Sequence, residues 1–70
     1  MNYYVIKYTI TEYFDEVEEK HFNVSNLFTS KKEAKEHLVR EGFEEKKYNF
    51  QRGSYGHWEE ADIEEIPVQE

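Results

Sequence analysis

Hydrophobic and polar residues alternate over residues 3–12, near the beginning of the chain. Four large apolar or aromatic residues fall on one side of this segment if it is extended: Tyr4, Ile6, Tyr8 and Ile10. A period of two, with β-branched and aromatic side chains, is typical of a strand. Residues 13–19 interrupt the alternation, so we interpret them as the connection to a second strand near residues 20–26. In that strand Phe22 and Val24 would face inward.

A helix is predicted to begin at Ser30 and to end near Glu41. Ser30 is a favourable N-cap residue, and Glu33 completes the S-x-x-E pattern of a capping box. Ala34 and Leu38 lie one turn apart on the side that we expect to be buried. Two residues that suit a Schellman motif follow, a glycine for the left-handed position and an apolar residue that packs back on the helix: Gly42 and Phe43.

Two further strands are predicted after the helix. Residues 45–52 would place Tyr48 and Phe50 on the same side, and the glycines of residues 53–56 indicate a turn. The last strand is predicted over residues 57–66. Taken together, the elements predict an α+β fold in ββαββ order. We expect a mainly antiparallel, four-stranded sheet with the helix packed on one face and the other face open to solvent.

The alternation in the last predicted strand does not show which face of the sheet two of its apolar residues occupy. Ala61 and Ile63 would point into the interior, whereas Trp58 and Ile66 are out of phase with them. Either a β-bulge re-aims Trp58 and Ile66, or both residues lie on the outer face of the sheet.

The composition is that of a single small domain, spanning residues 1–70. The chain has no cysteine, which excludes disulfides and thiolate zinc sites. Its six Tyr, five Phe and one Trp supply the large apolar surfaces that a core of this size needs. We expect a cytoplasmic protein, because the sequence shows neither a signal peptide nor an apolar run of about 20 residues that could span a membrane.

Acidic residues gather in two blocks. The net charge is −7, from sixteen acids against nine Lys and Arg. Residues 12–19 contain five acids and residues 58–70 contain six, and neither block contains Lys or Arg. In the last strand Glu60, Asp62 and Glu64 would point outward together, about 6.6–6.8 Å apart. This spacing resembles that of the charges along a nucleic-acid strand, and the repulsion within the row opposes folding.

The acidic blocks form a solvated surface that keeps the protein soluble, a surface that binds a basic partner, or a site for a divalent metal ion, although no D-x-D-x-D-G loop is present to organise calcium. Such a negative charge disfavours direct binding to nucleic acid. No catalytic, cofactor-binding or metal-binding motif is found, so we expect neither an enzyme nor a cofactor. The candidate residues for binding a protein partner are the outward acids and the aromatic residues beside them: Tyr13, Asp15, Glu16, Glu18, Glu19, Trp58, Glu60, Asp62 and Glu64.

The small size, the absence of cysteine, the aromatic content and the clustered acids resemble small bacteriophage-encoded inhibitors that mimic DNA. The resemblance is to a functional class and covers no motif, so it assigns no role to any residue. Within that class the chain most resembles inhibitors of the bacterial histone-like protein HU. The resemblance implies a basic DNA-binding partner in the host cytoplasm. The alternative is a small structural or regulatory domain that forms a homodimer or binds a protein through its open sheet face or edge.

Overall fold

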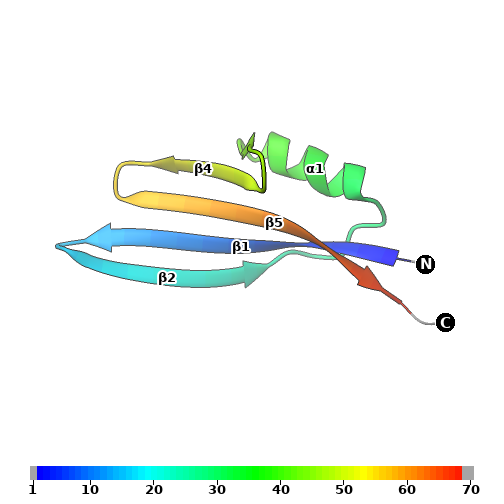
Figure 1. The fold of residues 1–70 in the computed structure, drawn as a ribbon, viewed down its shortest axis with the longest axis horizontal. Coiled ribbons are helices and arrows are strands. Elements are labelled where there is room, and N and C mark those ends of the chain that lie inside the picture. The colour runs from blue at the N-terminus through cyan, green and yellow to red at the C-terminus, as the bar shows by residue number, and fades with distance from the viewer. Residues whose placement is uncertain (1, 69–70) are drawn as a thin grey trace.

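The computed structural model describes residues 2–68, which form five strands and one helix (Figure 1). In chain order the elements are β1 (Asn2–Phe14), β2 (Val17–Val24), α1 (Lys31–Arg40), β3 (Glu44–Glu45), β4 (Phe50–Ser54) and β5 (His57–Pro67). The strands form one antiparallel sheet in the order β2-β1-β5-β4-β3. Among the described residues, no helix has the length and apolar character needed to cross a membrane.

The predicted four-stranded ββαββ fold of the α+β class is wrong. The described chain is mainly β, with five strands in ββαβββ order and one helix of ten residues, which lies beside one end of the sheet (Figure 1). The predicted third strand, residues 45–52, is broken by a turn. The Lys46 N–H donates to the Asn49 carbonyl at 2.7 Å. Tyr48 lies in this turn and is exposed, whereas Phe50 is buried, so their spacing did not reflect a shared strand face.

The hairpin between β1 and β2 is tighter than predicted. Phe14 pairs with Val17, so Asp15 and Glu16 alone form the turn. Both have positive φ, 48° and 67°, as in a type I′ turn, whose twist matches that of the flanking strands. No Asn-Gly or Asp-Gly pair marks this turn in the sequence. Most of the predicted connection over residues 13–19 is therefore strand.

The expectation that Phe22 and Val24 face inward is also wrong. They lie on β2, an edge strand, opposite Thr9 and Lys7 of β1. Directly paired residues share a sheet face, and this face is the one turned away from the buried core. Phe22 is 72% exposed. Alternation predicted the strand, but it could not tell which side of the strand would be covered.

The helix limits are confirmed. The Ser30 Oγ accepts a hydrogen bond from the Glu33 N–H at 3.1 Å, which satisfies one of the free donors of the first turn. At the other end Gly42 has a φ of 91°, and the Phe43 N–H donates to the Leu38 carbonyl at 3.0 Å. This bond is characteristic of a Schellman motif. It carries Phe43 back into the same buried cluster as Leu38.

The core is small and lies between the helix and the adjoining end of the sheet. Its buried members are Ile6, Ala34, Leu38, Phe43, Phe50 and Ala61. The predicted inward phase of β5 is confirmed, because Ala61 is fully buried and Ile63 packs against the cluster. β1 and β5 pair in one unbroken register, without a bulge. Trp58 and Ile66 therefore lie on the opposite sheet face.

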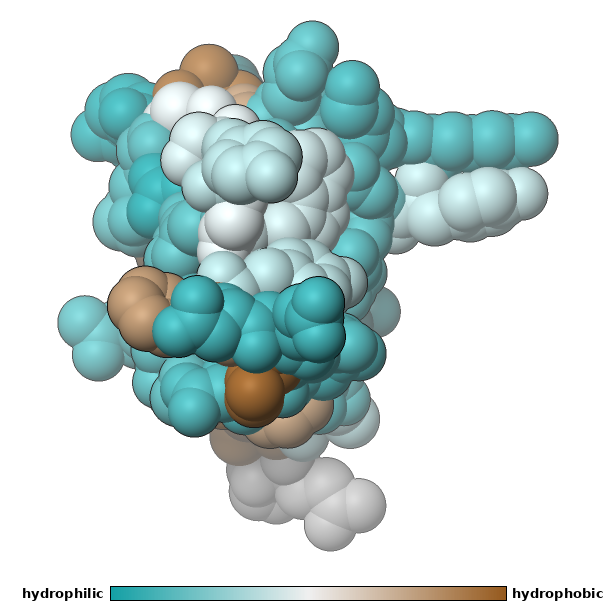
Figure 2. All heavy atoms as spheres, turned by 90° about the vertical axis from the view of Figure 1, so that its left-hand side faces the viewer, coloured by the Kyte–Doolittle hydropathy of each residue, from teal (hydrophilic) through white to brown (hydrophobic). Residues whose placement is uncertain are grey.

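The two long hairpins extend beyond the helix, which makes the molecule elongated, 49 × 21 × 19 Å (Figure 1). Their tips are joined by a hydrogen bond from the Tyr13 N–H to the Gly56 carbonyl, 2.9 Å long. Viewed from this end, the molecule shows a pale central strip of intermediate hydropathy among hydrophilic residues (Figure 2). Tyr13, Phe14 and Tyr55 at these tips are all exposed. The helix-covered half therefore holds the core, and the other half presents side chains to solvent.

Candidate partner-binding surface

One face of the sheet is turned away from the core, and we call it the open face. Side chains alternate between the two faces along a strand, and directly paired residues share a face. Because Ile6 and Ala61 point into the core, the strand residues out of phase with them belong to the open face. In the two central strands these are Tyr3, Val5, Lys7, Thr9, Thr11 and Tyr13 of β1, and Trp58, Glu60, Asp62, Glu64 and Ile66 of β5.

The strand register divides the nine predicted partner-binding residues unequally between the open face, the other face and the β1–β2 turn. Six of them share the open face: Tyr13, Glu18, Trp58, Glu60, Asp62 and Glu64. Asp15 and Glu16 form the turn at the end of that face. Glu19 pairs with Glu12 and lies on the other face. The first acidic block is therefore split, because neighbouring residues of a strand cannot point to the same side.

Four of the predicted residues meet around one hollow on the open face. This hollow, of about 370 Å³, is lined by Tyr13 from β1, Glu18 from β2, and Trp58 and Glu60 from β5, among others. Lys20 also lines it and places its Nζ 3.7 Å from a Glu18 carboxylate oxygen. Two carboxylates and two aromatic rings thus surround a space that is open to solvent.

A second hollow lies at the hairpin tips. It measures about 380 Å³ and is lined by Tyr13, Asp15, Glu16, Tyr55 and Gly56. Tyr13 borders both hollows. The acids of the β1–β2 turn are therefore continuous, through this ring, with the acids of the open face. Tyr55 was not among the predicted partner-binding residues, although it lies in the turn between β4 and β5 and is exposed.

Trp58 has one side packed and another accessible. It pairs with Gly53 of β4, and a Cβ at Gly53 would lie only 3.0 Å from the ring carbon Cζ3 of Trp58. The indole therefore occupies the space that a side chain at Gly53 would fill. It remains 39% exposed. Trp58 packs against a glycine, which has no apolar side chain, so the pattern of hydrophobic residues in the sequence could not predict this contact.

The acidic row of β5 is partly compensated by other strands. Lys7 of β1 lies opposite Asp62 and forms an ion pair with Glu64. Glu60 accepts a hydrogen bond from Asn49 Nδ2 at 3.2 Å. Glu64 and Glu60 therefore each have one polar partner, and Asp62 lies opposite Lys7 on the neighbouring strand. The spacing within β5 alone did not reveal Lys7, which comes from the neighbouring strand.

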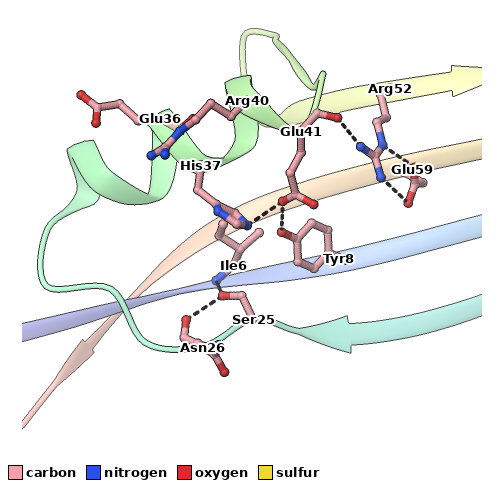
Figure 3. Close-up of polar contacts among 10 residues, drawn as sticks. All are labelled: Ile6, Tyr8, Ser25, Asn26, Glu36, His37, Arg40, Glu41, Arg52 and Glu59. Atoms are coloured by element: carbon pink, nitrogen blue, oxygen red, sulfur yellow. Dashed lines mark hydrogen bonds and ion pairs between the residues drawn. The ribbon is translucent and has the colours of Figure 1, made fainter.

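The other side of the sheet carries a polar network near the end of the helix (Figure 3). The Glu41 carboxylate accepts a hydrogen bond from the Tyr8 hydroxyl at 2.8 Å and lies 2.8 Å from His37 Nε2. Arg52 donates to a Glu59 carboxylate oxygen at 2.5 Å and to the Glu41 carbonyl. This network joins the helix end to β1, β4 and β5.

The network shifts the ionisation of its members. The hydrogen bond from Arg52 lowers the pKa of Glu59, whereas burial, followed by the hydrogen bond to Glu41, raises the pKa of Tyr8. A hollow of about 420 Å³ lies beside these groups. Each charged member already has a partner of opposite charge or a hydrogen bond within the network, so we assign the network to holding the helix against the sheet.

Comparison with known proteins finds no matching family model, no matching curated protein and no matching solved structure. Function therefore has to be inferred from the residues and geometry of this chain.

Proposed function

We propose that this chain is an acidic binding protein that covers the basic DNA-binding surface of a nucleic-acid-binding protein, as a DNA mimic does. The observation that carries the proposal is the hollow on the open face, where Glu18 and Glu60 stand beside Tyr13 and Trp58. Acids and accessible aromatic rings from three strands converge on this face. The resemblance to acidic DNA-mimic inhibitors suggests a partner such as HU.

The hollow suits a lysine or arginine side chain of the partner. A cation can pair with the carboxylates of Glu18 and Glu60 and lie against the face of Trp58 or Tyr13, since aromatic faces attract cations. Lys20 is bound to Glu18 only through an exposed pair, 3.7 Å apart. Exposed pairs contribute at most about 1 kcal/mol, so an incoming guanidinium can replace Lys20 at little cost.

The acidic row extends the contact along the sheet. Same-face residues of a strand lie about 6.6–6.8 Å apart, so Glu60, Asp62 and Glu64 offer a line of charges to a basic groove. Each contact is partly exposed to solvent and is therefore weak, and affinity comes from their sum. Complementary charges accelerate association and make binding sensitive to salt.

A triple charge reversal tests the proposal. Glu60→Lys, Asp62→Lys and Glu64→Lys in one chain should slow association and weaken binding to the basic partner. The matched control reverses three acids that lie off the open face, Glu36, Glu45 and Glu65, so the net charge changes equally. Binding to HU and to a panel of basic DNA-binding proteins is measured by calorimetry at two salt concentrations, with duplex DNA as competitor.

The outcomes separate mimicry from general charge attraction. The proposal requires that high salt weakens binding, that duplex DNA competes, and that the open-face reversal weakens binding much more than the control reversal. Equal loss in the two variants would indicate attraction to net charge alone. Binding by no member of the panel, or simultaneous binding of DNA and this protein to one partner, would overturn the proposal.

Self-association is the second candidate function, and the exposed edge of the sheet favours it. Phe22 and Val24 are exposed on β2, and the outer edge of β2 pairs with no other described strand. Such an edge can pair with another chain. Sedimentation over a range of protein concentrations distinguishes the two functions. A dimer that dissociates on Phe22→Thr/Val24→Thr substitution, without any affinity for basic proteins, would support self-association.

A further inference from the structure

Four glutamate and histidine side chains from three strands lie near one another on the sheet face opposite the open face. Glu12 of β1 pairs directly with Glu19 of β2 on one side and with His57 of β5 on the other. His21 lies two residues beyond Glu19 on the same side of β2. The cluster therefore contains residues that are far apart in the sequence, and their spacing matches no metal-binding motif.

The ligand atoms lie near one another, and small side-chain rotations would bring them around one ion. The carboxylate oxygens of Glu12 and Glu19 and an imidazole nitrogen of His21 all lie within 4.8 Å of one another. His21 Nε2 is 3.7 Å from a Glu19 carboxylate oxygen. All three side chains are accessible, about half exposed or more, so they can rotate inward without moving the backbone.

The opposition of Glu12 and Glu19 is unfavourable without a cation. Like charges directly opposite each other on neighbouring strands destabilise a sheet. The nearest positively chargeable groups are histidines, with His57 Nδ1 3.6 Å from a Glu12 carboxylate oxygen and His21 beside Glu19. A divalent cation between the two carboxylates would remove this repulsion and use the imidazole as its third ligand.

We propose that Glu12, Glu19 and His21 form a binding site for a divalent transition-metal ion, with Zn²⁺ as the ion that they suit. Imidazole nitrogen favours zinc, copper and nickel, whereas magnesium and calcium prefer sites made of oxygen alone. Zinc binds nitrogen and carboxylate oxygen at about 2.0–2.2 Å, and three protein ligands leave its fourth position to water or to a partner.

His57 serves as a positioning residue. It stands between Glu12 and Glu59, with its Nε2 3.7 Å from a Glu59 carboxylate oxygen. Glu59 is itself fixed by Arg52. A histidine held in this way orients the Glu12 carboxylate toward the ion, as outer partners do in metal sites. The site goes beyond the proposed function, because its ligands lie on the other face of the sheet.

Calorimetric titration of the untagged full chain with ZnCl₂ tests the site, and MgCl₂ serves as the selectivity control. One equivalent of Zn²⁺ should bind and raise the melting temperature, since an ion that binds only the folded state stabilises it. His21→Ala and Glu19→Gln should abolish saturable binding. His57→Ala should weaken the affinity by about tenfold. His37→Ala, which alters the histidine beside Glu41, should leave the affinity unchanged.

A second measurement keeps the test independent of folding defects in the variants. In the unaltered chain, Zn²⁺ should shift the side-chain nuclear magnetic resonances of His21 at one equivalent and leave those of His37 in place. The absence of saturable zinc binding, equal binding of Mg²⁺, or unchanged binding by the His21→Ala chain would overturn the proposal. A zinc-induced shift at His37 in place of His21 would also overturn it.

Discussion

At the scale of single residues, Gly53 decides how much of Trp58 is available on the candidate surface. The indole lies over the glycine on the neighbouring strand, where a Cβ would come within 3.0 Å of Cζ3 and 2.8 Å of the His57 carbonyl oxygen. A glycine usually weakens a strand. Here its lack of a side chain leaves room for the Trp58 ring over the neighbouring strand.

The substitution Gly53→Ala should therefore destabilise the protein by about 1–3 kcal/mol, the usual cost of overpacking. Part of this cost should disappear in a Trp58→Ala background, because the methyl group then meets only the His57 carbonyl. Urea denaturation of the two single variants and the double variant measures the coupling between the two sites. Strictly additive costs would show that the indole does not rest on Gly53.

At the scale of elements, the helix begins and ends through local signals and is held in place by few residues. Ser30 caps its start, and the Gly42–Phe43 stop returns the chain to the core. Only Ala34 and Leu38 of the helix are buried. Most of the helix surface faces solvent, so the attachment of this element depends heavily on Leu38.

Replacing Leu38 by alanine should lower the free energy of unfolding by about 2–5 kcal/mol, because it empties a fully buried site. The loss is large for a domain whose total stability is typically about 5–15 kcal/mol. Val39→Ala provides the matched control, since Val39 is the next residue and is exposed. Its cost should stay within about 0.5 kcal/mol. Equal losses in the two variants, measured by urea denaturation, would contradict the observed helix orientation.

At the scale of the whole molecule, the buried core lies at one end and the hairpin tips lie at the other, while Asp62 and Glu64 of the acidic row lie behind the core on the open face. The buried cluster lies at the helix end, and the accessible aromatics and turn acids lie at the hairpin tips (Figure 1). β1 runs through both halves, from buried Val5 and Ile6 to exposed Tyr13 and Phe14. A partner that binds the tips would therefore contact the part of the sheet with the least apolar packing.

This division predicts a gradient of amide hydrogen exchange along β1. Opening free energies are low where few apolar contacts support the hydrogen bonds. The amides of residues 5–8, beside the core, should exchange much more slowly than the paired amides of residues 10–14. Exchange followed by nuclear magnetic resonance measures the gradient. Uniform protection along the whole strand would show that the sheet opens as one unit.

Local signals in the sequence determined several features without help from the fold. The capping serine and the glycine stop set the limits of the helix, because both act within one turn of the backbone. Alternation predicted the first and last strands and the inward phase of Ala61 and Ile63. Each of these features depends on residues that are neighbours in the chain.

Tertiary structure alone decided how many strands form, which faces are covered and which distant residues meet. The turn at residues 46–49 split one predicted strand in two, and the missing cover left Phe22 exposed. Cross-strand register brought Trp58 to Gly53 and Glu12 to Glu19. The physical reason is that a strand pattern has two equivalent sides, and only pairing and packing with distant segments determine which side meets the core and which neighbours it finds.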